Sequence, residues 1–386
     1  MKQLIAVTLL LLMTTPCLMA QKKELSQARS SIKSGKYADA EKTLTALLKD
    51  STNRTNKRIW LAYYDAVLGQ YEQGNEKLYL KQQYDTASFF AKALQMLTIA
   101  ETLDSLTTDN RKSLSQQLNA LRPNIFNGGS FLLRKNKWAD AYRYYEAYLD
   151  CARQPLFQAY HYDSLDTRMP EAAYWATYCG YKQQDPVLTL RYSKQALQDT
   201  TKADFTLQFI AEARRLLKDD ELYVQTLEEG FRRYPQFHYF FPRLMDAYAN
   251  MGQHEKALAL TDSALTVNPS SELFLFAKST TLLRMERYAE SIKYSERLIE
   301  LNPNLAEPYF NAGTAYVNIA ERQNDKRDKK LMRQAYQKAC PFMEHYRKLM
   351  PKEKAKWAPV LYRIYLNLNM GKEFDEVESI IRRKKK

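Results

Sequence analysis

Glycine and proline are scarce in this sequence, with 10 Gly and 13 Pro in 386 residues. A β protein needs many tight turns, and these two residue types supply most of them. The scarcity therefore argues against a turn-rich β fold and favours an all-α chain. Aromatic residues make up 12% of the sequence and are mostly tyrosine, which suits the half-buried seams between packed helices.

Cysteine is also rare. Apart from one cysteine near the N-terminus, the chain has only Cys151, Cys179 and Cys340. An odd number of cysteines cannot form a complete disulfide framework. Cys151 and Cys179 can pair in an oxidising compartment, or both can be small buried hydrophobic residues, which is the commoner arrangement. The sequence leaves both alternatives open.

Sequence patterns that carry chemistry are missing. The four histidines are His161, His238, His254 and His345, and none has a His or Cys three or four residues away, as a helical metal site requires. There is no Gly-x-Ser-x-Gly motif, no glycine-rich phosphate loop and no CxxC pair. We therefore expect no enzyme activity, no catalytic residues, no metal site and no cofactor.

A single apolar run, Leu4–Met13, is followed by a proline and Ala20 and preceded by a lysine. This order predicts a secretory signal peptide over residues 1–20. The run is too short to cross a bilayer, and no other segment is long and apolar enough, so the protein is not expected to be transmembrane. Cys17 invites lipid attachment, but the preceding Thr14–Pro16 departs from the lipoprotein pattern, and the question stays open.

A period of 34 residues runs from His238 to Asn304. Two successive units fill the same slots with the following residues: Tyr248, Gly252, Ala257, Ala264 and Pro269, then Leu282, Glu286, Ser291, Leu298 and Pro303. Two antiparallel helices joined by a tight turn need a small residue where they cross, which Ala257 and Ser291 provide. Gly252 tolerates the positive φ of the turn, and each proline starts the next hairpin, where a missing N–H costs nothing.

This pattern resembles the tetratricopeptide repeat (TPR), with the best matches over 238–271, 272–305 and 306–350. Degenerate copies continue to both ends of the chain. The resemblance implies a right-handed α-solenoid of about eight or nine stacked TPR-like helical hairpins, forming one domain over 21–386 with a basic tail at 382–386.

The period is irregular in several places. We expect inserts near Gln70–Gln83, Phe157–Met169 and Asn318–Lys330, and a degenerate hairpin that begins at Arg122. Pro341 falls inside an expected helix, which predicts either a kink or the start of a new helix there.

In the TPR family the first helix of each hairpin lines a concave face. Carried onto this sequence, the inward positions include Tyr174, Tyr178, Tyr181, Arg215, Tyr239, Phe276, Arg284 and Phe310. An aromatic groove with scattered arginines implies binding of a protein or peptide partner, although some of these tyrosines can instead pack internally. Asn311 matches one position of the family's carboxylate clamp without its lysine partners, which argues against recognition of a free C-terminal carboxylate.

The net charge is +14, and residues 321–386 hold 19 Lys/Arg against 9 Asp/Glu. This basic C-terminal end is either a surface for anionic partners or a solubilising cap of the kind that terminal repeats need. A nucleic acid partner is not expected, because the signal peptide directs the protein away from it.

Together these features predict an exported scaffold that binds a protein or peptide in the cell envelope. The tyrosine-rich repeats and the signal resemble secreted TPR proteins of Bacteroides-type bacteria, which implies the periplasm or the outer-membrane periphery of a Gram-negative cell. The alternative is a glycan-binding protein of an outer-membrane nutrient-uptake system, with its sugar site in the inserts at Gln70–Gln83 and Phe157–Met169. A third interpretation is an inert spacer.

Overall fold

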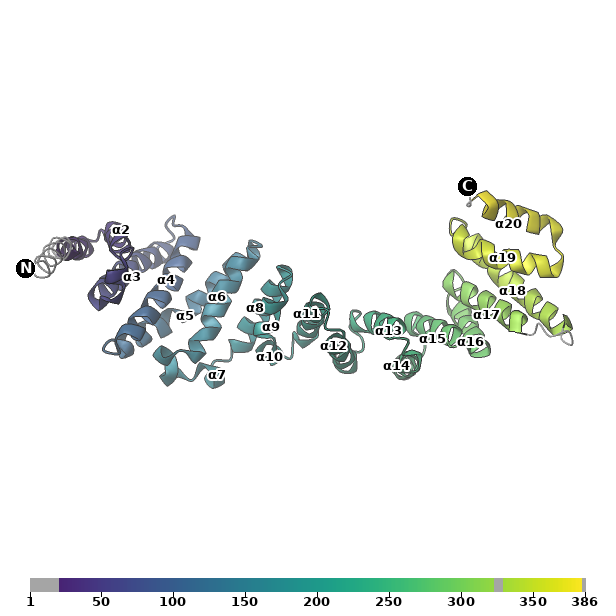
Figure 1. The fold of residues 1–386 in the computed structure, drawn as a ribbon. Helices are drawn as coiled ribbons and strands as arrows, with labels where there is room; N and C mark the ends of the chain where they lie inside the picture. The colour runs from purple at the N-terminus through teal and green to yellow at the C-terminus, as the bar shows by residue number, and fades with distance from the viewer. Residues whose placement is uncertain (1–20, 323–328, 384–386) are drawn as a thin grey trace, which may run out of the picture. The chain divides into compact units, whose positions relative to one another are not determined.

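The computed structural model describes residues 21–322 and 329–383, and it divides into two compact units between Thr226 and Leu227. All regular elements in these residues are helices (Figure 1). The all-α fold class is therefore confirmed. The predicted signal peptide and the last three residues of the basic tail lie outside the described residues, and the assignment of 21–386 to one domain stays a prediction.

The first unit begins with a helix over residues 21–33 and ends within α12. Its further elements are α2 (Tyr37–Leu47), η1 (Ser51–Thr55), α3 (Lys57–Tyr79), α4 (Thr86–Leu106), α5 (Arg111–Arg134), α6 (Trp138–Asp150), η2 (Cys151–Arg153), η3 (Pro155–Tyr160), α7 (Tyr162–Leu165), α8 (Met169–Lys182), α9 (Pro186–Arg191), α10 (Ser193–Ala196), α11 (Ala203–Leu216) and α12 (Asp220–Arg233).

The described residues of the second unit include four successive helix pairs. Their helices are α13 (Phe240–Asn250) with α14 (His254–Val267), α15 (Glu272–Arg284) with α16 (Tyr288–Leu301), α17 (Glu307–Arg322) with α18 (Lys329–Leu349), and α19 (Lys354–Leu368) with α20 (Gly371–Arg383). Within the unit each hairpin packs on the next, as α14 does on α15, α16 on α17 and α18 on α19.

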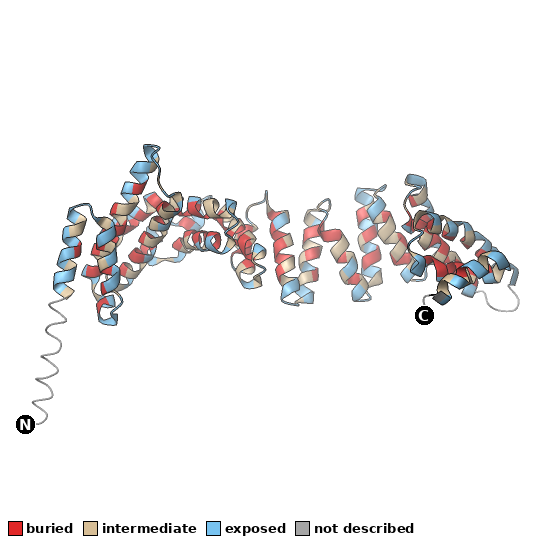
Figure 2. Ribbon diagram, turned by 90° about the horizontal axis from the view of Figure 1, so that it is seen from above, coloured by how far each residue is buried: buried red, intermediate tan, exposed pale blue. Residues whose placement is uncertain are grey.

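Small residues lie where the helices cross, as the repeat pattern predicts. Ala40, Ala257 and Ser291 are all buried, and buried residues follow the sides of the helices that face their neighbours (Figure 2). Large side chains at these positions would hold the helices apart. The burial therefore supports the alignment of the repeat slots.

The turns inside the hairpins share one backbone feature. Each such turn that lies within the described residues contains a residue with φ near +60°, and glycine occupies only two of these positions, Gly35 and Gly252. The others are Lys81, Asn136, Gln184, Lys218, Glu286 and Asn369. A left-handed residue ends a helix and lets the chain reverse, which non-glycine residues do at a cost of about 1 kcal/mol. Gly252 and Glu286 occupy the same position of successive repeats, and both have a positive φ although only one is glycine.

Two details of the sequence prediction were wrong, and a third alternative is resolved in part. The hairpin expected from Arg122 starts at Arg111, and Arg122 is buried in the middle of α5. Most of the expected insert at Gln70–Gln83 continues α3, because nothing before Leu80 breaks the helix. Of the two alternatives at Pro341, the structure excludes the start of a new helix, since α18 runs from Lys329 to Leu349 through the proline.

Candidate functional site

One hollow of the second unit is a groove between α13 and α15, which we call the α13–α15 groove. It consists of two adjoining hollows of about 280 and 310 Å³, and Phe241, Pro242 and Leu273 line both of them. Because α13 and α15 are the first helices of successive hairpins, the groove is lined by the helices on which the sequence predicts partner binding.

Aromatic packing fixes the floor of this groove. The ring of Phe241 is buried and meets the rings of Phe274 at 4.6 Å and Phe231 at 5.6 Å. Pro242 follows in the first turn of α13, where its missing N–H leaves no intrahelical bond unmade. The side chains beyond this floor, Leu273 and Phe276, are not fully buried, so an apolar partner can still cover them.

The groove also carries two opposite charges. Asp246 from α13 and Arg284 from α15 line the same hollow, and both side chains are exposed. No ion pair joins either of them to another described residue. An apolar groove with one available carboxylate and one available guanidinium can hold an extended peptide and also fix its direction and register.

The structure brings together some of the predicted binding residues. Phe276 and Arg284 line the α13–α15 groove. Tyr181 and Arg215 line a separate hollow of about 270 Å³ in the first unit, where Arg215 is already paired with Glu212 at 2.8 Å. Whether any of the predicted residues contacts a partner stays a prediction, but these four lie in hollows.

The other four predicted residues contribute mainly to packing. Tyr174 is buried against Trp175 and Phe209, and Tyr239 is buried with the Arg243 guanidinium 3.9 Å above its ring. These two tyrosines leave little surface for a partner. Tyr178 and Phe310 are half-buried and pack on neighbouring rings, at 5.6 Å from Phe209 and 5.1 Å from Tyr346 respectively.

Sequence reasoning missed three residues that line the same groove. Pro242, Met245 and Asp246 all face it from α13. Their spacing of three and four residues places them on one face of the helix. Such spacing was visible in the sequence, but nothing in it distinguished the exposed face of α13 from the buried one.

Asn311, the lone match to a carboxylate clamp, is occupied by internal contacts. Its side-chain amide is buried and donates to the hydroxyls of Ser279 at 3.2 Å and Thr280 at 3.0 Å. Ser279 in turn shares a hydrogen bond of 2.6 Å with Ser295. This network joins α15, α16 and α17, and it leaves the Asn311 amide committed to packing.

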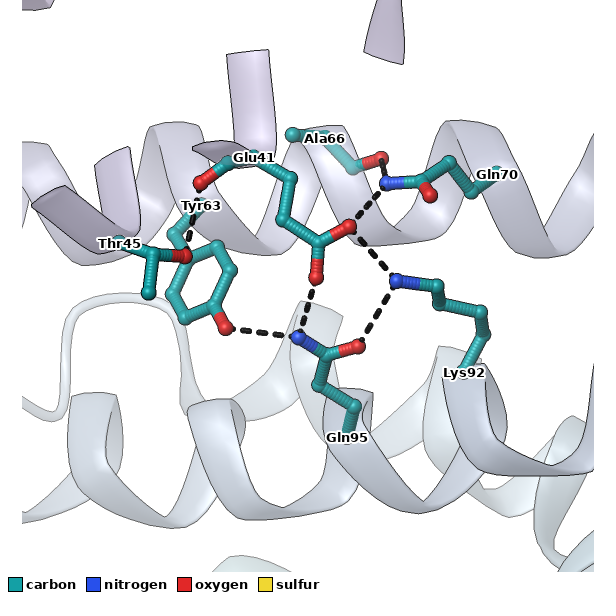
Figure 3. A network of polar contacts seen from close by, with 7 residues as sticks. All are labelled: Glu41, Thr45, Tyr63, Ala66, Gln70, Lys92 and Gln95. Atoms are coloured by element: carbon teal, nitrogen blue, oxygen red, sulfur yellow. Dashed lines mark hydrogen bonds and ion pairs between the residues drawn. The ribbon is translucent and has the colours of Figure 1, made fainter. Parts of the chain in front are cut away.

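A polar cluster around Glu41 in the first unit is also held by internal hydrogen bonds (Figure 3). The Glu41 carboxylate accepts hydrogen bonds of 2.6 Å from Gln70, Lys92 and Gln95, and Gln95 donates to Tyr63 at 2.7 Å. Burial alone raises the pKa of Glu41, but these donors outweigh it and the pKa is lowered. The cluster ties α2, α3 and α4 together through an ionised carboxylate.

The insert after α6 packs inward around a buried arginine. The Arg122 guanidinium lies between the rings of Tyr148 and Tyr162, at 3.6 and 3.8 Å from their centroids, and pairs with Asp166 at 2.5 Å. Phe157 is buried in the same region. The insert is therefore held by cation–π and charged contacts to α5 and α6.

The three cysteines of the described chain are free, and burial raises the pKa of the Cys151 and Cys179 thiols to about 12. Thiols in such surroundings are poor nucleophiles. In residues 21–322 and 329–383 no group of three or more His, Cys, Asp or Glu side chains is arranged to hold a metal ion. The helices over the same ranges include none with the length and apolar character of a bilayer span.

Comparison with known proteins identifies the repeat. A family model of the tetratricopeptide repeat matches residues 274–305, which cover most of α15 and all of α16. No curated protein matches the chain.

Several solved structures are similar at low identity. The C-terminal part of a TPR repeat-containing protein from Cytophaga hutchinsonii is 15% identical with a TM-score of 0.45, over 65% of this chain and 92% of that chain. MamA from Desulfovibrio magneticus RS-1 is 15% identical with a TM-score of 0.33, over 45% and 95%. The TPR2AB domain of yeast Sti1, solved in complex with pHSP90, is 14% identical with a TM-score of 0.29, over 78% and 98%.

The matched repeat at 274–305 has the same helix–turn–helix form as the hairpins before and after it, and each buries a small residue at its crossing. Residues 274–305 are therefore a tetratricopeptide repeat.

Proposed function

We propose that this protein is a scaffold that binds an extended segment of a partner protein in the α13–α15 groove. The observation that carries the proposal is the groove itself, a continuous apolar channel that ends in charged side chains without partners. Phe276 and Leu273 supply apolar contacts for two or more partner side chains. Asp246 and Arg284 would each take a partner group of opposite charge.

The affinity of such a site is moderate. Burying one aromatic or aliphatic side chain contributes roughly 1.5–3 kcal/mol, and ordering the peptide removes part of that gain. Two anchors and two charge contacts therefore give binding in the micromolar range, on the order of 6–8 kcal/mol. A scaffold that assembles and releases its partners operates with affinities of this size.

The glycan-binding alternative is less well supported. It places the sugar site in the two inserts, but residues 70–79 extend α3, and the insert after α6 buries Phe157 and Tyr162 instead of presenting them. A sugar platform needs an exposed aromatic face. We therefore retain the peptide-binding proposal, and a glycan-array screen with tight, specific binding would reverse the preference.

The cell envelope is the proposed location. Support comes only from the sequence of residues 1–20, with its short apolar run and Ala20. Mass spectrometry of the protein purified from its native cells provides the test. A mature chain that starts at Gln21 supports export, whereas an intact residue 1–20 segment contradicts it.

Photo-crosslinking in living cells tests the groove. A photoreactive amino acid at position 276 is compared with the same amino acid at position 297, an exposed site on α16. We expect one partner to crosslink from position 276 and not from position 297. Peptides that tile this partner then give the bound segment, and fluorescence anisotropy gives its Kd.

Charge reversal supplies matched controls. Arg284→Glu should weaken binding of that segment about ten-fold or more, whereas Arg297→Glu changes the net charge equally on the other face of the hairpin and should leave Kd unchanged. Phe276→Ala should weaken binding by a similar factor, and Leu301→Ala should not. Equal crosslinking from both positions, or full affinity in the Phe276→Ala, Arg284→Glu double variant, would refute the proposal.

A further inference from the structure

A second hollow lies at the other end of the second unit, between α18, α19 and α20. We call it the C-terminal hollow. It has a volume of about 590 Å³ and is lined by ionisable side chains of both signs together with Trp357. Pockets of this size hold small molecules or short peptides. None of its residues belongs to the α13–α15 groove.

One end of the hollow is acidic. Glu344 from α18 and Glu373 from α20 both line it. The two carboxylates lie near the Cys340 thiol, and together with burial, the larger cause, they raise the pKa of that thiol to about 12. Glu344 accepts the Tyr365 hydroxyl at 3.2 Å, while no ion pair joins Glu373 to another described residue.

The opposite end is basic. Lys348 lies in the last turn of α18 and Lys354 in the first turn of α19, on either side of the turn at Pro351, and all three residues line the hollow. Both lysines are exposed, and within the described chain neither has an ion-pair partner. Lys354 lies about three turns along α19 from Tyr365, and Lys348 lies one turn beyond Glu344 on α18.

Between these two ends the hollow is lined by an Arg–Glu ion pair that lies against a tryptophan ring. Arg347 pairs with Glu376 at 2.5 Å, which joins α18 to α20. The Arg347 guanidinium also lies 4.8 Å from the ring of Trp357. Trp357 is 2% exposed, and its indole N–H has no acceptor among the described residues. Trp357 thus contributes its ring to the wall of the hollow while its N–H stays buried.

We propose that the C-terminal hollow binds a short zwitterionic peptide with free termini. Its ammonium group lies at Glu373 and Glu344, and its carboxylate lies at Lys348 and Lys354. The separated charges select this class of ligand over a simple anion, which would meet two carboxylates, and over a simple cation, which would meet two ammonium groups.

Isothermal titration calorimetry with trialanine at low ionic strength tests the proposal. The free tripeptide is compared with its N-acetylated and its C-amidated forms, each of which removes one charge. We expect each single block to weaken binding about ten-fold, the usual effect of losing one charged hydrogen bond. Inorganic phosphate should compete poorly.

Variants assign each end of the ligand. In the double variant Lys348→Ala, Lys354→Ala, the C-amidated and the free peptide should bind with equal affinity. N-acetylation should still weaken binding in this variant. Glu373→Gln should show the converse. The matched controls are Lys329→Ala, Lys330→Ala and Asp375→Asn, which change exposed charges on α18 and α20 outside the hollow and should retain both penalties.

Three results would overturn the proposal. The first is no binding of free trialanine at millimolar concentration, and the second is equal binding of a doubly blocked peptide. The third is strong competition by phosphate, which would make the hollow a plain anion site. The indole N–H resonance of Trp357, assigned by its loss in Trp357→Phe, should shift when free trialanine binds and stay fixed with the doubly blocked form.

Discussion

Gly180 gives the sharpest test of how the first unit is packed. It lies on α8 where that helix meets α9, and a methyl group added there would lie 2.7 Å from the carbonyl carbon of Leu188 and 2.8 Å from Cα of Thr189. Both atoms belong to the backbone, so no side chain can rotate to make room. Gly180→Ala therefore requires the two helices to separate by several tenths of an ångström or more.

The expected cost follows from two opposing effects. Overpacking of this kind costs about 1–3 kcal/mol or more, and replacing glycine by alanine within a helix returns up to about 1 kcal/mol. Because the contacted atoms belong to the backbone, the cost lies near the upper end of that range, and we expect a net loss of about 2 kcal/mol. In a unit of roughly 200 residues each 1 kcal/mol lowers Tm by about 2–4 °C.

Thermal unfolding followed by circular dichroism at 222 nm measures this loss, and calorimetry separates the transitions of the two units if they differ. Gly371→Ala is the control, because a methyl group there meets nothing within 4 Å and the substitution should be neutral or slightly stabilising. A Gly180→Ala protein as stable as the parent would show that α8 and α9 do not approach as described.

Three further predictions concern backbone strain, pH and thiol chemistry. Lys218 has φ of +57°, so Lys218→Gly should raise the unfolding free energy by about 0.5–1 kcal/mol in urea titration. Burial alone raises the pKa of Asp166, but hydrogen bonds from Tyr148 and Arg122 hold it below its usual value. The ionised Asp166 therefore adds to the free energy of unfolding above pH about 4, and this contribution is lost as the pH falls further. The difference in unfolding free energy between the parent and Asp166→Asn should thus shrink in acid. Because Cys151 and Cys179 are buried and free, iodoacetamide without reductant should label both only after unfolding, and a missing label would indicate a disulfide.

The architecture was predictable because it repeats. Small residues at the slots of Ala257 and Ser291, with prolines at equal spacing, define helical hairpins without reference to the rest of the chain. Boundaries were less predictable where the period breaks. The sequence does not show that Arg122 is enclosed by Tyr148 and Tyr162, which belong to two later helices, α6 and α7.

The site was predictable only in part, for a related reason. Phe276 and Tyr239 occupy equivalent inward positions, yet one lines the groove and the other is buried beneath an arginine. Burial of a tyrosine depends on the side chains that the adjacent hairpin places over it, and repeat alignment does not contain that information. The charges at Asp246 and Arg284 matter because they lack partners, which again only three-dimensional packing decides.

Five of the ten glycines in this chain pack directly against aromatic rings. Methyl groups at Gly69, Gly128, Gly129 and Gly230 would meet the rings of Tyr37, Tyr144, Tyr145 and Phe240, and Gly74 faces Tyr84 in the same way. In each pair the ring occupies the space that a side chain at the glycine would need, so neither residue can be substituted independently of the other. A lineage that enlarges one of these glycines must shrink the opposing ring, and engineered consensus repeats placed into this chain will fit only if both halves are exchanged together.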